Sequence, residues 1–342
     1  MTDADGTGLD LVTRTRLLKT GVGFAVAVLA LVLIAVGVGW REVAAALADA
    51  RWRWVAVGCL ATLLCLACWG RAWQVVLRVV GIDVAFRRLV VTYFAATFAN
   101  YVTPLGQAGG EPFIAYVLSR DTEASYEDSL ASVVTADLLN LLPFFSFAAL
   151  GTGILLWQAQ LPAVAQSLTW GLLAMAVGVP AIAVAAWTFR QRLFGLGMRL
   201  GAPVARRVGR FSVEGLRERL HDLGAAFDRI AADPRALAQA VAFAYLGWLF
   251  FALPLYFAGL ALDLPIGLLL VFFVVPASTL AGITPSPGGL GGVEFALATL
   301  LVALTAVPAA DAYALALVYR VMSYWFALAV GGAATLWVVR RA

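Results

Sequence analysis

Two glycine-rich stretches carry the residues of this chain that are best suited to chemistry. "TPLGQAGGEPF" covers residues 103–113 and "TPSPGGLGGVEF" covers residues 284–295. Both begin with Thr-Pro, reach a Gly-Gly pair and then a glutamate, which is Glu111 in the first stretch and Glu294 in the second. Glycine permits tight turns and close backbone approach, and proline ends a preceding helix. Each stretch therefore predicts a break between two helices with a carboxylate beside it.

Charged residues inside apolar segments accompany the two stretches. Asp137 and Arg320 each follow one of the two glutamates by 26 residues, and Arg71 lies in another apolar run. A charge at the centre of a bilayer costs roughly 2.5–3.5 kcal/mol on insertion scales, so such residues face a polar cavity or pair with each other. Asp137 with Arg320, or Glu294 with Arg320, are natural pairs. Fastening of helices by such a pair is the simpler alternative.

These residue types predict a binding site rather than a catalytic one. The planar fork of arginine suits phosphate, which predicts phosphate contacts for Arg320 and Arg71. The carboxylates of Glu111, Asp137 and Glu294 suit a cationic group, a coupling proton, or the arginines when no substrate is bound. The helices that begin near Gly110 and Gly292 would point their positive ends at the two breaks.

The predicted hairpin backbone of this binding site has members in both glycine-rich stretches. They are Pro104, Gly106, Gly109, Gly110, Pro285, Pro287, Gly288, Gly289, Gly291 and Gly292. Because glycines are also common where membrane helices pack closely, a plain interhelical loop or a small-residue packing motif is the competing interpretation.

Composition places these stretches in a membrane protein. Hydrophobic residues make up 63% of the 342 residues, charged residues only 13%, and the mean hydropathy is +0.91. Continuous apolar runs of about 20 residues indicate transmembrane helices. The sequence therefore predicts an all-α polytopic membrane protein with about six full transmembrane helices. They are expected at about 20–40, 54–80, 126–157, 164–189, 236–261 and 310–339.

The remaining segments define the predicted organisation. Residues 1–19 form a polar tail, and residues 20–342 form a single transmembrane domain. Short apolar segments on either side of the glycine-rich stretches predict two re-entrant or broken-helix hairpins, at about 89–119 and 264–307. The segment 190–235 holds ten arginines and five acidic residues, and an apolar stripe from Leu216 to Ile230 predicts an amphipathic connector at the membrane surface.

Arginine placement predicts the topology. Basic loops face the cytoplasm, so the connector, both termini and the loop at 80–88 are expected inside. The first hairpin then leaves and re-enters from the inside and the second from the outside, which predicts inverted repeats with both tips near the middle of the bilayer. This scheme leaves the arginines of the loop at 41–53 outside, against the rule.

Other classes of site are disfavoured. Cys59, Cys65 and Cys68 lie in one apolar run, and the single His221 lacks the partners of a metal site, so neither a metal nor a cofactor is expected. The arginines report topology rather than nucleic-acid binding. There is no P-loop lysine motif for ATP. Ser286 lies in the right stretch for a lipid-phosphate hydrolase, but it has no accompanying base, so the expected protein is not an enzyme.

Three stretches together resemble a known family. "TPLGQAGGEPFIAYVLSR", "PSPGGLGGVEFALATLL" and "LVYRVMSYW" are similar to the lysylphosphatidylglycerol synthase transmembrane region, also called the flippase-like domain family. In its best-understood members this region moves an aminoacylated phospholipid between leaflets and is fused to a soluble synthase domain. The resemblance implies translocation without aminoacylation, because these 342 residues contain no such domain. The family has a basic residue three positions after the first glutamate. Ile114 stands there in this chain, so no anion contact is carried over to the first hairpin.

The sequence and the resemblance lead to one expected function. A membrane lipid, with a phospholipid, glycolipid or isoprenoid-linked headgroup, would cross between leaflets of the cell membrane through a polar cavity at mid-membrane. A transporter of small soluble solutes, a lipid-phosphate hydrolase and a membrane scaffold are the alternatives. A homo-oligomer and a lipid-modifying enzyme partner are both compatible with the sequence.

Overall fold

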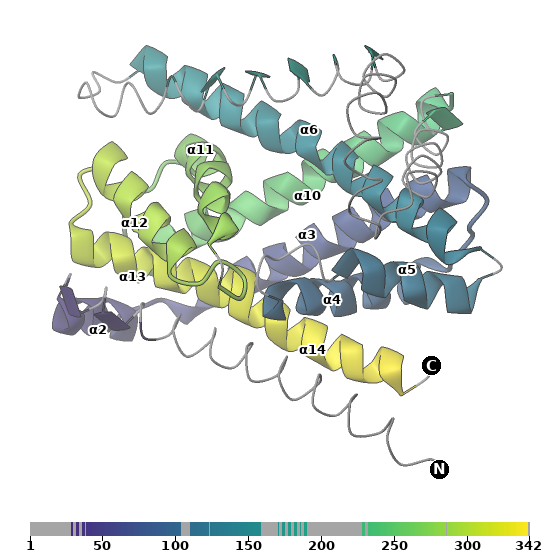
Figure 1. Ribbon diagram of the computed structural model, residues 1–342. Helices are drawn as coiled ribbons and strands as arrows, with labels where there is room; N and C mark the ends of the chain where they lie inside the picture. Colours follow the sequence, from purple (N-terminus) through teal and green to yellow (C-terminus); the bar gives the residue numbers. More distant parts are fainter. Residues whose placement is uncertain are drawn as a thin grey trace, which may run out of the picture. The chain divides into compact units, whose positions relative to one another are not determined.

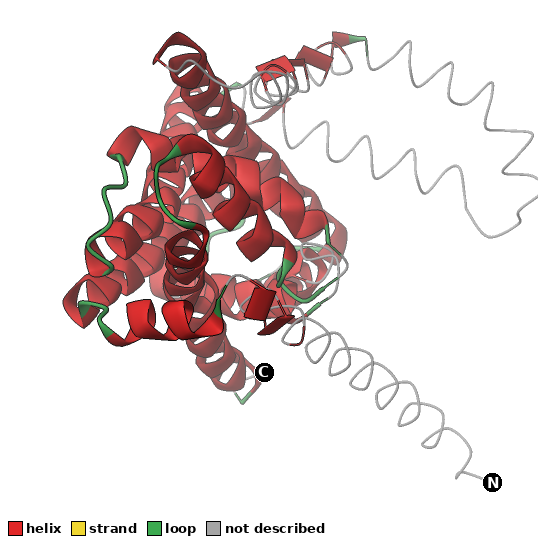
Figure 2. Cartoon of the chain, turned by 90° about the vertical axis from the view of Figure 1, so that its left-hand side faces the viewer, coloured by secondary structure: helices red, strands yellow, loops and turns green. Residues whose placement is uncertain are grey.

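The computed structural model of the protein is built of helices. It describes residues 39–103, 110–122, 124–158, 232–284 and 286–340, with scattered positions in 29–37, 170–189 and 228–229. No strand occurs in these described residues (Figure 2). The all-α fold class is therefore confirmed. The polar tail at 1–19 and most of the connector at 190–235 lie outside the described residues.

Four helices of the described part are long and apolar enough to cross a membrane. They are α3 (Trp52–Val79), α6 (Tyr126–Gln158), α10 (Pro234–Ala261) and the continuous helical stretch Ala309–Val338. The 28 residues of α3 or α10 span about 42 Å, which exceeds a hydrocarbon core of about 30 Å. These are four of the six predicted spans. The other two, at about 20–40 and 164–189, fall mostly outside the described residues.

Shorter helices flank each glycine-rich stretch, as the sequence predicted. The first stretch follows α4 (Phe86–Val102) and leads into α5 (Gly110–Asp121). The second follows α11 (Leu268–Thr279) and the 3₁₀ turn η2 (Leu280–Ile283), and leads into α12 (Gly292–Leu304). The 12 and 13 residues of α11 and α12 span only about 18–20 Å, too little to cross a bilayer. The re-entrant and inverted arrangement of the two hairpins stays a prediction.

The chain forms two compact units. Unit 1 holds Met1–Leu66, Val91–Phe113 and Leu249–Ala342, and unit 2 holds Ala67–Val90 and Ile114–Trp248.

In unit 1, α12 packs between α11 and the last span (Figure 1). That span consists of α13 (Ala309–Arg320), the π-helical turn η3 (Val321–Trp325) and α14 (Phe326–Val339). The amphipathic helix α2 (Trp40–Ala48) buries Val43 against Tyr313 and Ala314 of α13. Small residues bring α4 close to α14, because a Cβ added to Gly331 would lie 2.6 Å from the Phe94 carbonyl oxygen.

One arginine of the 41–53 loop has an acidic partner in unit 1. Arg51 donates to Asp263 at 2.8 Å, and its backbone N–H donates to the Ala261 carbonyl oxygen at 2.8 Å. Both side chains are exposed, so the ion pair adds little stability. The pair nevertheless joins the start of α3 to the turn after α10.

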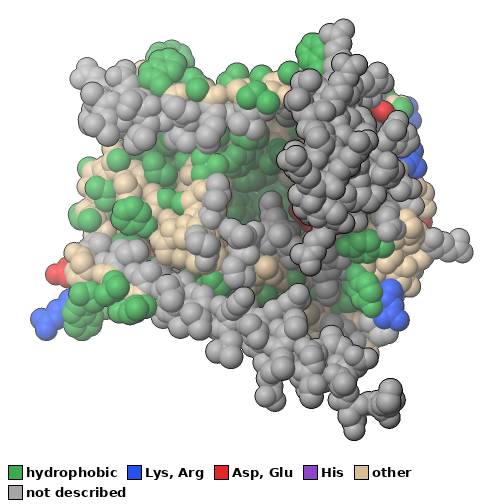
Figure 3. Space-filling model, viewed as in Figure 1, with side chains coloured by type: hydrophobic (Ala, Val, Ile, Leu, Met, Phe, Trp, Pro, Cys, Tyr) green, Lys and Arg blue, Asp and Glu red, His purple; other side chains and the backbone are tan. Residues whose placement is uncertain are grey.

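The visible surface agrees with a lipid-facing protein. On the face drawn in Figure 3, hydrophobic side chains predominate among the coloured atoms, and basic side chains are seen toward its edges. Large apolar side chains such as Leu60, Leu150 and Leu269 are more than half exposed. In water such a surface would promote association, whereas lipid tails cover it without penalty.

Candidate functional site

The second glycine-rich stretch folds into a tight loop before α12. Gly288, Gly289 and Gly291 have φ of +57°, +65° and +85°, a region that favours glycine. Gly288 has a second requirement, since an added Cβ would lie 2.0 Å from Cε2 of Tyr324. An added Cβ at Gly292 would likewise lie 2.2 Å from Oγ1 of Thr284. Glycine at position 288 therefore lets the loop lie directly against the last span, and glycine at position 292 lets α12 begin close to Thr284.

Glu294 closes the loop from the first turn of α12. Its Oε2 accepts a hydrogen bond from the Gly291 N–H at 2.7 Å, at the position where the helix begins. A carboxylate here complements the positive end of the helix dipole. The Glu294 residue is 0% exposed. The predicted place of this glutamate, in the first helical turn after the glycines, is therefore confirmed.

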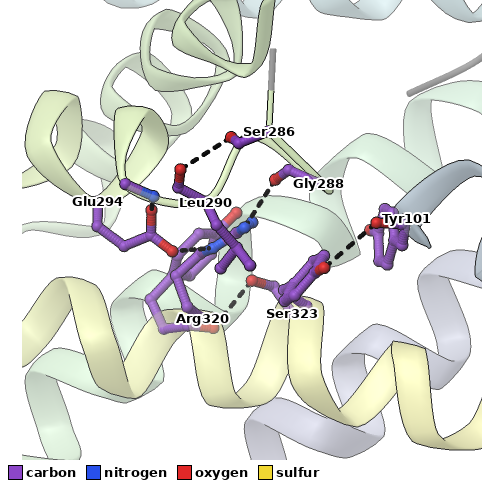
Figure 4. Close-up of polar contacts among 10 residues, drawn as sticks. Tyr101, Ser286, Gly288, Leu290, Glu294, Arg320 and Ser323 are labelled. Carbon is purple, nitrogen blue, oxygen red and sulfur yellow. Dashed lines mark hydrogen bonds and ion pairs between the residues drawn. The ribbon is translucent and has the colours of Figure 1, made fainter. Parts of the chain in front are cut away.

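Arg320, the last residue of α13, binds both the glutamate and the loop (Figure 4). Its Nε donates to Oε1 of Glu294 at 2.7 Å, and its Nη2 donates to the Gly288 carbonyl oxygen at 2.7 Å. Arg320 is only 7% exposed. Of the two pairings that the sequence left open, the structure contains the one with Glu294. The result is a neutral, hydrogen-bonded ion pair in the apolar interior of unit 1.

Aromatic residues lie next to the guanidinium of this pair. The guanidinium carbon of Arg320 lies 4.3 Å from the centre of the Tyr324 ring, within the range of a cation–π contact. The Tyr324 ring in turn lies 4.9 Å from that of Tyr101, and its hydroxyl donates to the Tyr101 carbonyl oxygen at 3.2 Å. Tyr101 lies in the last turn of α4, just before the first glycine-rich stretch. The end of α4, in the first predicted hairpin, thus meets the last span through these tyrosines.

The helix carrying Arg320 changes form directly after it. Residues Val321–Trp325 make the π-helical turn η3, a rare form that is frequent at functional sites. Thr62 of α3 donates to the Met322 carbonyl oxygen at 2.9 Å within this turn. Gly58, one turn earlier, leaves the space that the Met322 sulfur occupies, because an added Cβ would lie 2.0 Å from it. Helix α3 therefore fits closely against the irregular turn beside the ion pair.

The other predicted site residues lie elsewhere. Asp137 belongs to unit 2, where its Oδ1 accepts a hydrogen bond from the Trp73 indole at 2.9 Å. Arg71, also in unit 2, bonds to Gln74. Glu111 is a partly exposed residue in the first turn of α5, in unit 1. The structure thus brings Glu294 and Arg320 together. A role in substrate binding stays a prediction for all five of these residues.

The structure describes little or nothing of several residues of the predicted hairpin backbone. Pro104, Gly106, Gly109 and Pro285 lie outside the described residues, and Gly110 is described only as the first residue of α5. Pro287 belongs to the loop before α12, where its carbonyl oxygen accepts from the Leu290 N–H at 3.2 Å. Ile114, which stands where the resembling family has a basic residue, is 0% exposed. It packs as an apolar core residue.

Sequence reasoning missed the residues that position Arg320. Tyr101, Tyr324 and Thr62 have ordinary residue types in apolar runs, and neither period nor motif distinguishes them. The one available signal was "LVYRVMSYW", which contains both Arg320 and Tyr324. The Gly288 carbonyl oxygen was equally invisible, because a backbone acceptor leaves no mark in the sequence.

With this geometry established, comparison with known proteins identifies the family. The sequence profile of the lysylphosphatidylglycerol synthase TM region matches residues 21–331. The chain belongs to this family. The resemblance noted in the sequence is thereby confirmed, and the match to this transmembrane region establishes a multi-pass membrane protein.

Individual relatives of the chain are similar to it over most of their length. A UPF0104 membrane protein of Methanothermobacter thermautotrophicus is 29% identical over 306 residues, which cover 86% of this chain and 88% of the relative. A UPF0104 membrane protein of Pyrococcus horikoshii is 23% identical over 290 residues, covering 82% of this chain and 85% of the relative. Their names describe membrane proteins and state no activity.

Proposed function

We propose that this protein moves the headgroup of a membrane lipid between the two leaflets. The observation that carries the proposal is the buried pair of Glu294 and Arg320, held between a glycine loop and an irregular turn in the last span. A scaffold has no need of charges there, because apolar side chains of similar volume would pack at no desolvation cost. Membership of the family supports the proposal.

The pair suggests how an anionic headgroup would bind. Arginine binds phosphate through two parallel hydrogen bonds, and Nε and Nη2 of Arg320 already make two such bonds to protein oxygens. In our proposal Glu294 and the Gly288 carbonyl oxygen take the place of phosphate when no lipid is bound. An arriving phosphate exchanges with them, while Glu294 keeps its hydrogen bond from the Gly291 N–H at the positive end of α12, so neither side chain is left without a partner. No bond of the lipid is broken, and the protein acts as a transporter rather than an enzyme.

The glycine loop suggests where the movement occurs. The short helices α11, with its 3₁₀ turn η2, and α12 lie before and after the loop. Backbone groups at such a break need protein or water as partners inside a membrane. We propose that this is the place where the headgroup enters while its tails stay in the bilayer. Rocking of one repeat against the other would then open the site to alternate sides. In this proposal the protein lies in the cell membrane with both termini in the cytoplasm.

A vesicle assay tests the proposal. The purified full chain is placed in liposomes that carry a trace of lipid labelled on its headgroup, and a membrane-impermeant quencher reports the label in the outer leaflet. Lipids with anionic, zwitterionic and isoprenoid-phosphate headgroups are compared with protein-free liposomes. Translocation of at least one of them is expected. If no lipid moves faster than in protein-free liposomes, the proposal fails and transport of a soluble solute becomes the leading alternative.

A further inference from the structure

A second arginine, in unit 2, has an arrangement that the buried pair does not explain. Arg71 lies in α3, eight residues before the helix ends at Val79, which places it about 12 Å from that end. Its side chain is partly buried. The guanidinium carbon lies 5.7 Å from the centre of the Phe86 ring and 5.9 Å from that of Phe243. One aromatic ring from α4 and one from α10 therefore flank the guanidinium of Arg71, and both rings belong to unit 2.

A buried glutamine holds Arg71 in this frame. Gln74, one turn further along α3, is 1% exposed, and its Oε1 accepts a hydrogen bond from Nη1 of Arg71. Its Nε2 donates to the Val84 carbonyl oxygen at 2.7 Å, which ties it to the loop between α3 and α4. Both ends of the amide are thus used. The glutamine fixes the direction of the guanidinium but supplies no charge.

Among the described residues, the positive charge of Arg71 has no carboxylate as its counter-charge. Three other arginines of the described residues, Arg51, Arg78 and Arg320, have a carboxylate within 3.1 Å. Among the same residues, no carboxylate forms an ion pair with Arg71, whose partners are a neutral amide and two rings. A partly buried cation among apolar side chains loses hydration that only an anion restores in full. Within the part of unit 2 that the structure describes, the surroundings of Arg71 therefore supply no anion.

We propose that Arg71 binds a phosphate-bearing anion and that Gln74 is its positioning residue. Guanidinium and phosphate match in geometry and charge, and an amide that occupies one nitrogen leaves the rest of the planar fork for two phosphate oxygens. The exposed arginines Arg78, Arg87 and Arg88 near the same loop favour the approach of anions. This inference does not depend on translocation, because a binding site at Arg71 can exist whether or not the buried pair in unit 1 moves lipid.

Binding titrations test the inference without any transport. The full chain in a neutral detergent is titrated with dioctanoyl phosphatidic acid in a calorimeter, with dioctanoylglycerol as the matched lipid that lacks phosphate. Arg71→Gln is expected to weaken binding of the phosphatidic acid by roughly tenfold or more, the loss of a charge-assisted pair. Arg41→Gln removes the same charge from an exposed position in α2, in unit 1, and is expected to change binding by no more than about twofold. Equal affinity of Arg71→Gln and wild type would overturn the proposal.

A second variant separates binding from a purely structural role. Gln74→Glu keeps the size of the side chain but places a carboxylate on Arg71, so the protein should unfold at the wild-type temperature or above and yet bind phosphatidic acid roughly tenfold more weakly. A Gln74→Glu protein that is folded and binds like wild type would show that Arg71 only fastens the loop. Competition by inorganic phosphate would show that the phosphate group suffices, and its absence that the site needs a lipid headgroup. Either result of the competition experiment is consistent with an anion site at Arg71 and only defines which anion it takes.

Discussion

Glu294 and Arg320 act as one neutral group inside unit 1. The carboxylate is fully buried, the guanidinium is nearly so, and their nearest atoms lie 2.7 Å apart. Either residue alone would be an uncompensated charge away from water. Breaking a buried pair by removing one partner costs about 3–5 kcal/mol, whereas replacing both partners by apolar residues is often neutral. The pair is therefore weak as a stabilising device, which is a reason to assign it a role in binding.

A double-mutant cycle tests this property of the pair. Glu294→Gln alone should destabilise the protein by about 3–5 kcal/mol, because Arg320 stays buried without a counter-charge. Adding Arg320→Met should recover much of that loss, since no charge remains. Thermal unfolding in detergent, followed by circular dichroism, measures both. Additive losses in the double variant would show that the two side chains act independently.

Gly288 is the third residue on which the site depends. Gly288→Ala should destabilise the loop by about 2 kcal/mol or more, because alanine is strained at φ of +57° and its Cβ would overlap the Tyr324 ring. Gly267→Ala is the matched control, since that glycine has φ of −68° and no heavy atom within 4 Å of an added Cβ. Similar unfolding temperatures for the two variants would contradict the proposed fit of the loop against Tyr324.

Only part of this residue-level arrangement could be predicted from the sequence. Glu294 and Arg320 were identifiable, because charges are conspicuous in apolar runs and glycines beside a glutamate suggest a helix start. The sequence could not choose between Asp137 and Glu294 as the partner of Arg320, since that choice depends on how the helices pack. Tyr324 and Thr62 were not identifiable at all, because their contacts join residues distant in the chain.

At the scale of helices, hydropathy and helix-breaking residues predicted most boundaries. The span predicted at 54–80 is the helix Trp52–Val79, and the span predicted at 236–261 is the helix Pro234–Ala261. These predictions succeed because a long apolar run between polar loops is stable in a membrane as a helix. The π-helical turn η3 was not predicted, because nothing in "VMSYW" departs from an ordinary apolar helix. Thr62 donates a hydrogen bond to its backbone, and Gly58 leaves room for the Met322 side chain. Both residues lie far from the turn in the sequence, so only the folded structure shows these contacts.

The packing of α4 on α14 allows a sharp test within one helix. Gly331→Ala should destabilise the protein by about 1–3 kcal/mol, because its Cβ would lie 2.6 Å from a backbone oxygen and neither helix can yield locally. The neighbouring Gly332→Ala is the control, since its nearest contact would be an ordinary 3.4 Å to the Phe98 ring. Unfolding temperatures of the two purified variants decide the matter. A larger loss for Gly332→Ala would mean that the helices pack through another face.

At the scale of the whole molecule, the fold class and the family are established, and sidedness is a prediction. The distribution of arginines predicts the loop between α3 and α4 in the cytoplasm and the turn between α10 and α11 outside. The exception at the 41–53 loop is eased by the Arg51–Asp263 pair, since both residues lie in segments predicted to face the same side.

Thiol labelling in intact cells tests this topology. In a variant without the three native cysteines, a single cysteine is introduced at one of two exposed positions, by Ala85→Cys or by Pro265→Cys. A membrane-impermeant maleimide should label the second variant in intact cells and the first only after lysis. Labelling of both variants from the same side would contradict the predicted inverted repeats.

The most direct test of the central claim compares wild type with Arg320→Ala in the headgroup-quenching assay. Both proteins are inserted into the same liposomes at matched amounts, with a lipid that the wild type moves and with Arg87→Ala as an exposed control. We predict quenching well beyond the outer half of the label for wild type and Arg87→Ala, and quenching limited to that half for Arg320→Ala. If folded Arg320→Ala translocates lipid as fast as wild type, the buried pair is not on the transport path and the proposed mechanism is wrong.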